Sequence, residues 1–439
     1  MRFLRHLLTL WIVIVLACAA RAQKFDNFGR DRAREILRNI AEDIKKHYYD
    51  PDFHGVDFDQ RVRDADEKLR QSTSVTEAYK LIAWAIQGLN DLGTFFLPPS
   101  SHFSVDYGWQ IQMFGDHCYV TRVRPKSDAE AKGLKPGDEV VSVNGVKVTP
   151  ASIGRLAYII GILSPQPELH MQIRGIADGE RQLVVQAKVD QLKEIRPGTL
   201  WAEAKDTLVS FDKLAKKNRP RCESVDELAI CKMPLHHLEN QQTEAKEVRD
   251  LLAFAQKHQG LILDLRGAGG DLAVLEVFTG GIFDHEFKIG DWVSRGGTRP
   301  QMAKPQHDHF TGKLVVLLDS DSSSASEILA RTVQLQKRGT VLGDRSAGSV
   351  RTSKFYWYHF KTSDVLDSYE ASITDADFLM PDGQSLEGKG VIPDELLLPA
   401  RDDLATGNDP VLARAAELAG VKLTPENAGK LFPWEWPKE

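Results

Sequence analysis

Two segments between residues 28 and 92 have the apolar spacing of amphipathic helices. In residues 34–50, one helical face carries a run of large side chains, namely Ile36, Leu37, Ile40, Ile44 and Tyr48. Residues 74–90, "SVTEAYKLIAWAIQGLN", repeat the pattern with Ser74 or Thr76 as the N-cap. The polar link "YDPDFHGVD" separates the two segments. We therefore expect an N-terminal helical region.

The spacing of apolar residues changes from a helical pattern to an alternating one after residue 104. "HCYVTRVRP" alternates like a strand, "SDAEAKGLKPGD" has the composition of a short helix and turn, and "EVVSVNGVKV" predicts two strands joined by an Asn-Gly turn. These elements predict a compact β-rich module over residues 104–190.

Strand-like runs alternate with helical ones from residue 195 to residue 400. Their order is "DELAICKMP", "EAKEVRDLLAFAQKHQ", "GLILDLRG", "KLVVLLD", "SASEILARTVQLQ" and "GTVLGD". This alternation is typical of an α/β layer around a mostly buried sheet. The segment "DPVLARAAELAG" predicts a further helix, with an apolar stripe of Val411, Leu412, Ala415 and Leu418.

The N-terminus has the pattern of a secretory signal. A basic "MRFLRH" precedes an apolar run that ends at Ala20, and the small residues of "ARA" follow. We expect a signal peptide over residues 1–22, cut after Ala22, since the apolar run is short for a membrane span. Cys18 leaves a lipoprotein as the alternative, although Leu16 stands where a small residue is expected. We expect an exported protein, periplasmic or extracellular, that meets a membrane only through export or such an anchor.

Composition and charge exclude few classes of function. The 439 residues are 42% hydrophobic and 27% charged, as in ordinary soluble proteins of several domains. A net charge of −6 gives no electrostatic reason to expect nucleic acid as a partner. Export permits disulfides, so Cys222 and Cys231 either close a small loop or stay free thiols like Cys118. No C-x-x-C pair is present, and we expect neither a metal nor another cofactor.

The β-rich module resembles a PDZ domain in one long stretch, "SDAEAKGLKPGDEVVSVNG". The upstream "YGWQI" stands where PDZ domains carry the loop that binds a peptide's C-terminal carboxylate. The resemblance implies a peptide-binding role for Tyr107, Gly108, Trp109 and Gln110, with the peptide adding a strand to the sheet edge. The alternative is a β module that only packs against the rest of the chain.

Two strand ends carry residues suited to acyl-transfer chemistry. "GLILDLRGAGGD" ends in a glycine-rich turn, which frees backbone N–H groups to stabilise an oxyanion. "KLVVLLDSDSSSASEILA" runs from a strand into a serine-rich helix start, where the helix dipole favours negative charge. Taken alone, the glycines fit an ordinary turn and the serines fit ordinary N-capping.

Together these junctions resemble peptidase family S41, the tail-specific or C-terminal-processing proteases. "VLGDRSAG" and "PDGQSLEGKGVIPDELL" continue the match, and the order of helices, PDZ module and α/β core agrees with the family. The resemblance implies Ser324 as the nucleophile. It implies oxyanion donors at Gly269, Gly270 and Ala325, and Glu387 as the late glutamate of one branch. The implied core is an α/β fold of the ClpP/crotonase type.

Neither base of the family is present. The branch with a lysine in "TxGK" is matched here by "RSAGS", with Ser349 at the lysine position. The tricorn-type branch has a histidine in "DxHT", and the matching segment keeps Asp91 and Thr94 but has Gly93 at the histidine position. Loss of the base costs a serine peptidase about a millionfold in turnover, or about 8 kcal/mol.

Other residues are weak substitutes for the base. Lys354 lies about 16 Å beyond Ser349 along an extended strand, with the opposite facing. The remaining side chains are histidines that each fit an ordinary polar role, and His307 with His309 makes a poor metal pair without a third ligand. These histidines are His102, His236, His237, His307 and His309.

The sequence thus predicts a multi-domain α/β protein with consecutive units. They are a signal peptide (1–22), a helical region (23–103), a PDZ-like domain (104–190), an S41-like core (191–400) and a helical tail (401–439). We expect a serine peptidase that acts on protein or peptide C-termini through an acyl-enzyme at Ser324. The alternatives are a peptide- or ligand-binding pseudoprotease and a scaffold that uses only its PDZ surface.

Overall fold

The computed structural model describes residues 25–99, 103–191, 220–233, 241–361, 366–434 and 436. The expected signal peptide lies outside these residues, as do His102, His236 and His237. Among the described residues, no helix has the length and apolar character needed to cross a bilayer.

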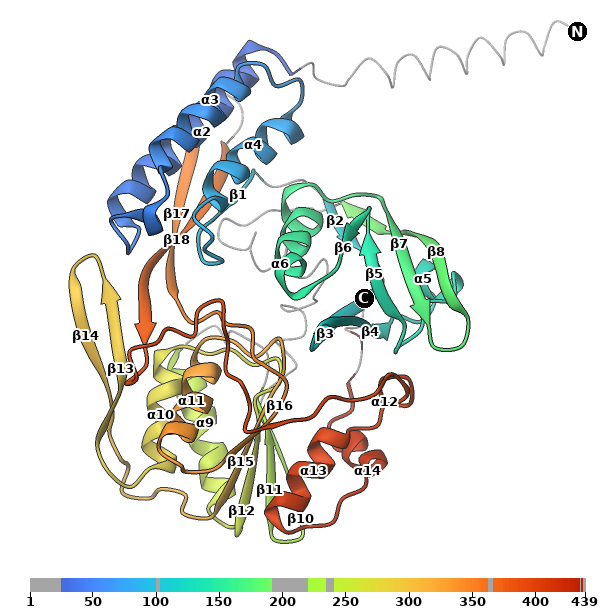
Figure 1. Ribbon diagram of the computed structural model, residues 1–439, viewed down its shortest axis with the longest axis vertical. Coiled ribbons are helices and arrows are strands. Elements are labelled where there is room, and N and C mark those ends of the chain that lie inside the picture. The colour runs from blue at the N-terminus through green and yellow to red at the C-terminus, as the bar shows by residue number, and fades with distance from the viewer. Residues whose placement is uncertain are drawn as a thin grey trace, which may run out of the picture.

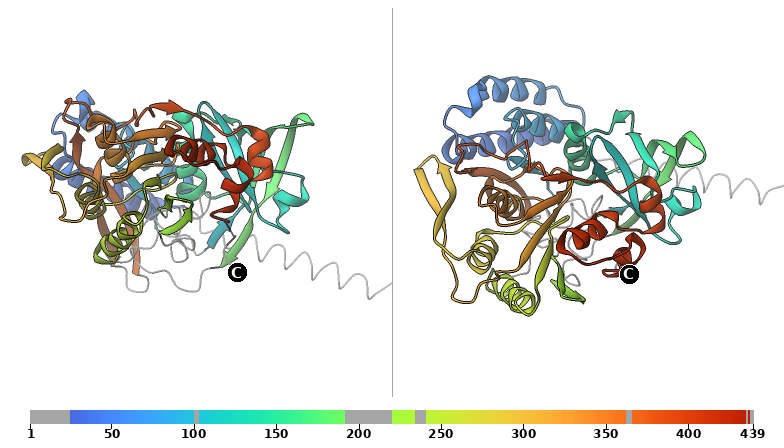
Figure 2. Two further views of the ribbon diagram at one scale, coloured as in Figure 1. Left: turned by 90° about the horizontal axis from the view of Figure 1, so that it is seen from below. Right: turned by 60° about the horizontal axis from the view of Figure 1, so that its bottom comes forward.

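The N-terminal helices pack on a long β-hairpin that comes from the far end of the chain (Figures 1 and 2). The helical elements are α2 (Asn27–His47), η1 (Phe53–Gly55), α3 (Phe58–Leu69) and α4 (Val75–Gln87). The apolar stripe expected on α2 is buried, and Ser74 is the N-cap of α4 because its side chain accepts from the Glu77 N–H. The hairpin shares a sheet with three other strands; its members are β1 (Phe95–Leu97), β13 (Phe287–Ser294), β14 (Gly297–Ala303), β17 (Thr352–Lys361) and β18 (Leu366–Leu379).

The β-rich module is a separate sheet with its own apolar core. Its strands are β3 (Trp109–Phe114), β4 (His117–Val123), β5 (Glu139–Val143), β6 (Val146–Lys147), β7 (Glu168–Gly175) and β8 (Gly179–Gln186). The ribbon β2 (Phe103–Asp106) with β9 (Lys188–Gln191) closes the module, and its helical segments are α5 (Asp128–Ala131), α6 (Pro150–Tyr158) and η2 (Ile159–Leu163). Among the described strands, β3 pairs with β4 alone, so its outer edge has no strand partner in that part of the chain.

The core sheet has the order β10-β11-β12-β15-β16-β19. Its strands are β10 (Arg221–Val225), β11 (Leu228–Lys232), β12 (Gly260–Asp264), β15 (Lys313–Leu318), β16 (Thr340–Gly343) and β19 (Glu395–Leu396). All except β10 run parallel. Strands β11, β12, β15 and β16 are the ones that the apolar runs predict.

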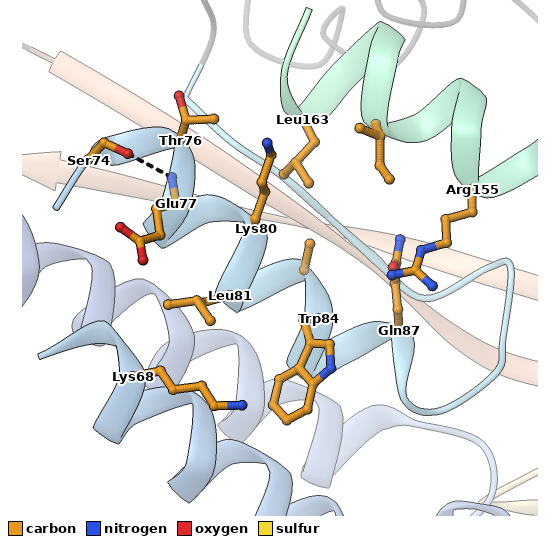
Figure 3. Close-up of a pocket in the computed structure, with 12 residues that line it drawn as sticks. Lys68, Ser74, Thr76, Glu77, Lys80, Leu81, Trp84, Gln87, Arg155 and Leu163 are labelled. Carbon is orange, nitrogen blue, oxygen red and sulfur yellow. Dashed lines mark hydrogen bonds between the residues drawn. The ribbon is translucent and has the colours of Figure 1, made fainter. Parts of the chain in front are cut away.

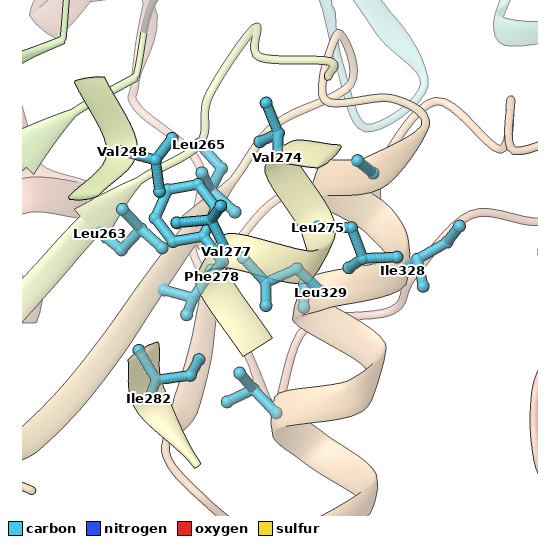
Figure 4. Packing of buried hydrophobic residues seen from close by; sticks show 14 of the residues in the cluster. Val248, Leu263, Leu265, Val274, Leu275, Val277, Phe278, Ile282, Ile328 and Leu329 are labelled. Carbon is cyan, nitrogen blue, oxygen red and sulfur yellow. The ribbon is translucent and has the colours of Figure 1, made fainter. Parts of the chain in front are cut away.

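Helices cover both faces of this sheet. One face carries α9 (Gln241–Ala255), α10 (Leu272–Ile282) and α11 (Ala325–Leu335), whose apolar side chains interlock with Leu263 and Leu265 (Figure 4). The other face carries α13 (Pro410–Ala419) and α14 (Pro425–Lys430), and α12 (Arg401–Thr406) precedes them. Two rigid helical layers therefore hold the strand ends that carry the candidate chemistry.

A disulfide joins Cys222 to Cys231 across the β10–β11 pair, where the two residues face each other directly. Cys118 is a free, buried thiol in β4. The structure therefore decides between the two alternatives that the cysteine spacing left open.

Candidate active site

The glycine-rich turn and the serine-rich helix start lie side by side. Strands β12 and β15 are parallel neighbours, so both chains leave the sheet at the same edge. Three hydrogen bonds then join the two loops: Gly267 N–H to Asp319 Oδ1 at 2.7 Å, Ser323 N–H to the Ala268 carbonyl at 2.9 Å, and Ser326 Oγ to the Gly269 carbonyl at 2.6 Å. The contact expected from the family pattern is thus made by backbone and short side chains.

Ser324 lies at the sharpest point of this junction. It precedes α11 with φ 57° and ψ −126°, a region that side-chain-bearing residues rarely adopt. Its hydroxyl does not cap the helix; it donates to the carbonyl of Gly270 at 3.0 Å. Ser324 is therefore the N-cap of α11 by position, while its hydroxyl is not used for capping; backbone strain that the surroundings hold in place is typical of functional positions.

Unused backbone donors lie in the segments next to Ser324. Within the described residues, the N–H groups of Gly269, Gly270 and Ala325 make no hydrogen bond. Gly270 has φ +121°, and a Cβ there would lie 3.3 Å from the Cβ of Ala325. The turn therefore needs glycine, and the predicted oxyanion donors are available to a ligand.

Glu327 fixes the segment that faces Ser324. The carboxylate accepts four hydrogen bonds, from Ser346 Oγ at 2.6 Å, Gly348 N–H at 2.7 Å, Ser349 N–H at 2.8 Å and Ser324 N–H at 3.1 Å. Burial raises the pKa of Glu327 to about 7, and the hydrogen bonds from Ser346 and the backbone oppose that shift. The sequence analysis missed this role, although Ser-x-x-Glu at a helix start is the signature of a capping box.

The structure places Ser349 directly beside the nucleophile. The carbonyl of Ser349 accepts from the Ser324 N–H at 2.8 Å, so the two backbones touch. The Ser349 side chain is half-buried and makes no hydrogen bond within the described part of the chain. A longer side chain at this position would begin next to Ser324.

Gly93 lies in a crowded place. A Cβ at Gly93 would lie 2.5 Å from Thr374 Oγ1, which is closer than real contacts allow. Thr374 in turn contacts Thr94 through its hydroxyl and its backbone. The position that holds histidine in the tricorn-type branch therefore has no room for a side chain unless Thr374 moves.

A charged network occupies the surroundings of Gly93. Asp91 accepts from the Gly93 N–H and the Thr94 hydroxyl, and Arg351 lies 3.8 Å from Asp91 and 3.2 Å from Asp377. The Arg351 guanidinium also stacks on the ring of Tyr49 at 4.9 Å. The sequence analysis did not single out Arg351, because its partners are remote in the chain.

The other candidate bases lie elsewhere. Lys354 is paired with Asp375 at 2.8 Å, and His307 is fully exposed beside Asp308. His307 and His309 both lie in the loop after β14. In the described residues, no cluster of side chains is suited to hold a metal ion.

Glu387 supports the backbone rather than Ser324. Its Oε2 accepts from the N–H groups of Val350 at 2.9 Å and Arg351 at 3.1 Å. Burial raises the pKa of Glu387, against those backbone hydrogen bonds. Glu387 thus holds the chain just after Ser349, and its catalytic role stays a prediction.

The predicted carboxylate loop of the β-rich module is held by its own side chains. Tyr107 Oη donates to the Gln166 carbonyl at 2.8 Å, and the Gly108 N–H donates to Asp106 at 2.8 Å. Gly108 has φ +73°, and a Cβ there would lie 2.5 Å from the Cβ of Ser127. Gln110 accepts from Arg122, while the buried Nε1 of Trp109 has no partner within the described residues.

Strand β3 connects this loop to the nucleophile. Gln112 Nε2 donates to Asp319 at 2.7 Å, and Ser320 Oγ donates to the Met113 carbonyl at 2.6 Å. The N–H of Gly115 donates to Asp344 at 2.8 Å. The free edge of β3 therefore leads from the predicted carboxylate loop to the chain that precedes Ser324.

Comparison with known proteins gives the family. Residues 229–397 match the family model of peptidase family S41, and residues 104–174 match that of the PDZ domain. The core of this chain thus resembles peptidase family S41 over residues 229–397. The family resemblance, the mixed α/β fold class and the serine-peptidase class expected from the sequence are confirmed.

Two curated relatives match most of this chain. The carboxy-terminal processing protease CtpA of Bacillus subtilis (strain 168) is 25% identical over 417 residues, 89% of this chain and 77% of the relative. The chloroplastic carboxyl-terminal-processing peptidase 3 of Arabidopsis thaliana is 24% identical over 392 residues, 84% and 70% of the two chains. The crystal structure of mature CPAF has a TM-score of 0.62 at 13% identity, over 86% of this chain and 94% of that one, which shows the shared fold.

A pocket lies apart from Ser324, between α4 and the α6–η2 segment (Figure 3). Its volume is about 540 Å³, and Trp84, Leu81 and Leu163 line it together with the cations Lys68, Lys80 and Arg155. Lys68 lies over the Trp84 ring at 4.3 Å. Nothing in the structure shows what fills this pocket, so the active-site assignment remains with Ser324.

Proposed function

We propose that the protein is an exported serine peptidase of the C-terminal-processing type, with the acyl-enzyme at Ser324. The observation that carries the proposal is the strained Ser324, whose hydroxyl contacts Gly270; the N–H groups of Gly270 and Ala325 make no hydrogen bond within the described residues. The relatives named as carboxy-terminal processing proteases support the substrate class. The signal-like N-terminus and the Cys222–Cys231 disulfide support export to an oxidising compartment.

The reaction assigns each part of the site a role. Ser324 Oγ bonds to the carbonyl carbon of the scissile peptide, whose oxygen takes the negative charge. The N–H groups of Ala325 and Gly270 are placed to stabilise that oxyanion. The C–N bond then breaks, the amine leaves with the proton given up by Ser324, and water releases the acyl group from the enzyme.

The PDZ module presents the substrate in this proposal. A peptide that adds to the free edge of β3 extends towards Asp319 and Ser320, in the chain before the nucleophile. The carboxylate loop sets the end of the peptide, and the β3 edge sets its direction. This arrangement supports cleavage near a C-terminus rather than at random sites.

A second candidate function is a pseudoprotease that binds peptides without turnover. The observation that favours it is the hydrogen bond from Ser324 to the Gly270 carbonyl, which is no base. Among the described residues, no titratable side chain accepts from the Ser324 hydroxyl, and the two family base positions are Gly93 and Ser349. The site would then keep the nucleophile and the oxyanion donors of its relatives and lack the proton acceptor.

Hydrolysis by pure protein and its Ser324→Ala variant tests the proposal. We expect peptide hydrolysis by the wild type and its loss in Ser324→Ala. The matched control is Ser323→Ala, because only the backbone of Ser323 makes a hydrogen bond and alanine keeps it. Hydrolysis that persists in Ser324→Ala contradicts the peptidase mechanism, and hydrolysis absent from all three folded proteins supports the pseudoprotease.

A further inference from the structure

Two tryptophans near the C-terminal end lie against the PDZ module. Trp434 stacks over the Arg122 guanidinium at 4.2 Å, and Trp436 stacks over that of Arg124 at 4.5 Å. Trp436 Nε1 also donates to the Val123 carbonyl at 3.3 Å, and the two indole rings meet edge to face at 4.7 Å. This segment follows Leu431 and Phe432, which pack on the helical face of the core sheet.

The spacing of the two pairs matches. Arg122 lies in β4 and Arg124 directly follows the end of that strand, and both side chains meet the tryptophans. Trp434 and Trp436 have the same spacing in the sequence, and this spacing puts side chains on one face wherever a chain is extended. The contact therefore consists of two arginine–tryptophan stacks. An extended segment with aromatic residues at alternate positions can reproduce them.

Both arginines also hold the predicted carboxylate loop. Arg124 pairs with Asp106 at 2.7 Å, and Asp106 accepts from the Gly108 N–H. Arg122 donates to Gln110 Oε1 at 3.0 Å. Each tryptophan is thus one side chain away from the loop over which the PDZ module is expected to bind a peptide end.

The same place carries buried donors that nothing satisfies. Within the described residues, Arg124 Nε and Trp109 Nε1 are buried without a hydrogen-bond partner. Arg122 has no carboxylate in ion-pair contact in that part of the chain, and burial lowers its pKa to about 10. Buried donors without partners are rare in folded proteins and indicate a missing acceptor.

We propose that Arg122 and Arg124 form a docking surface for polypeptide segments with aromatic residues at alternate positions, and that Trp434 and Trp436 occupy it at rest. The inference rests on the proposed role of the PDZ module in presenting substrates and names a substrate class for it. The aromatic rings of such a segment supply the stacking on the two guanidinium groups. Substrates must therefore displace the chain's own segment.

A binding assay tests this competition. The probe is a fluorescein-labelled peptide of residues 430–436, "KLFPWEW", read by fluorescence anisotropy. We expect the Trp434→Ala/Trp436→Ala variant to bind it about tenfold more tightly than the wild type, the factor that corresponds to about 1.4 kcal/mol of self-docking. Adding Arg124→Ala to that variant is expected to remove the gain.

Two controls distinguish stacking on Arg122 and Arg124 from nonspecific binding of the probe. Trp357→Ala removes an exposed tryptophan of β17, and its affinity for the probe is expected to equal that of the wild type. A probe with both tryptophans replaced by alanine is expected not to bind. Equal affinity of the wild type and the double variant overturns the proposal, and so does a folded double variant that does not bind the probe.

Two further measurements keep the test decisive. Thermal unfolding shows whether the double variant is folded, and the single Trp434→Ala variant repeats the test with one stacking contact removed. The same titrations in a Ser324→Ala background do not depend on turnover. A protein that binds the probe without hydrolysing peptides is therefore distinguishable from one that hydrolyses peptides without binding the probe.

Discussion

The two halves of the candidate site are built differently. The nucleophile half consists of Ser324, the glycine turn and the first turn of α11, joined by hydrogen bonds between short loops. The base half consists of single side chains at positions 93 and 349, and here both are small. The nucleophile half keeps its hydrogen-bonded geometry, although neither family base is present in the base half.

The base of such a site can therefore be lost while the nucleophile half stays in place. Backbone N–H groups and a strained turn are products of the fold, and they persist as long as the sheet and α11 persist. A base is one side chain, so one substitution removes it without disturbing the core. The structure thus combines an intact oxyanion environment with a hydroxyl that donates to a carbonyl.

The largest expected effect comes from restoring a base at position 349. In Ser349→Lys the backbone contacts to Ser324 and Glu327 remain, and the new amine starts next to the nucleophile. We expect the rate of Ser324 acylation by an activated ester to rise about 10²- to 10⁴-fold, the range of general base catalysis. Burst kinetics measure that rate.

Gly93→His is the matched comparison. Since Thr374 Oγ1 occupies the place of the new Cβ, we expect no gain in the single variant. The gain is expected only when Thr374→Ala is added. A gain in Gly93→His alone that exceeds the gain in Ser349→Lys contradicts the geometry described for the two positions.

Glu327→Gln disrupts hydrogen bonds in the nucleophile half of the site. The amide presents an NH₂ group to donors that now bond a carboxylate oxygen, so two buried N–H or O–H groups lose their acceptor. We expect a loss of about 3 kcal/mol in the free energy of unfolding, measured by urea denaturation. Arg345→Gln, at an exposed position nearby, is the control, and an equal loss in both variants contradicts the role of Glu327.

The raised pKa of Glu327 gives a pH dependence with a definite sign. Between 4.5 and about 7 the unfolded chain has released this proton while the folded protein still binds it. The unfolding free energy is therefore expected to fall as pH rises through that window. Denaturation at several pH values should show a shallower fall in Glu327→Gln, and parallel curves for the two proteins contradict the assignment.

The smallest effect is expected at Lys354. Its ammonium group is exposed and paired with Asp375, and a surface pair of this kind contributes about 0–1 kcal/mol. Lys354→Ala should leave the acylation rate of Ser324 unchanged within about twofold. If burst kinetics show a loss of more than about tenfold in the acylation rate, Lys354 is the general base for Ser324.

Periodicity predicted the elements around Ser324, because β12 and β15 are continuous apolar runs with clear ends and α11 is amphipathic. It missed the β13–β14 and β17–β18 hairpins. Strand β18 pairs with β1 and packs on the N-terminal helices, which are remote in the chain. The roles of Glu327 and Arg351 were also missed. Glu327 had a local signal in Ser-x-x-Glu, whereas Arg351 meets Asp91 only after folding.

Labelling with a fluorophosphonate probe, read by intact mass, tests the central claim that Ser324 is an activated nucleophile. We expect one adduct on the wild type, its absence in Ser324→Ala, and faster labelling in Ser349→Lys. An adduct that survives in Ser324→Ala contradicts the account. A folded wild type that stays unlabelled also contradicts it and identifies the protein as a pseudoprotease.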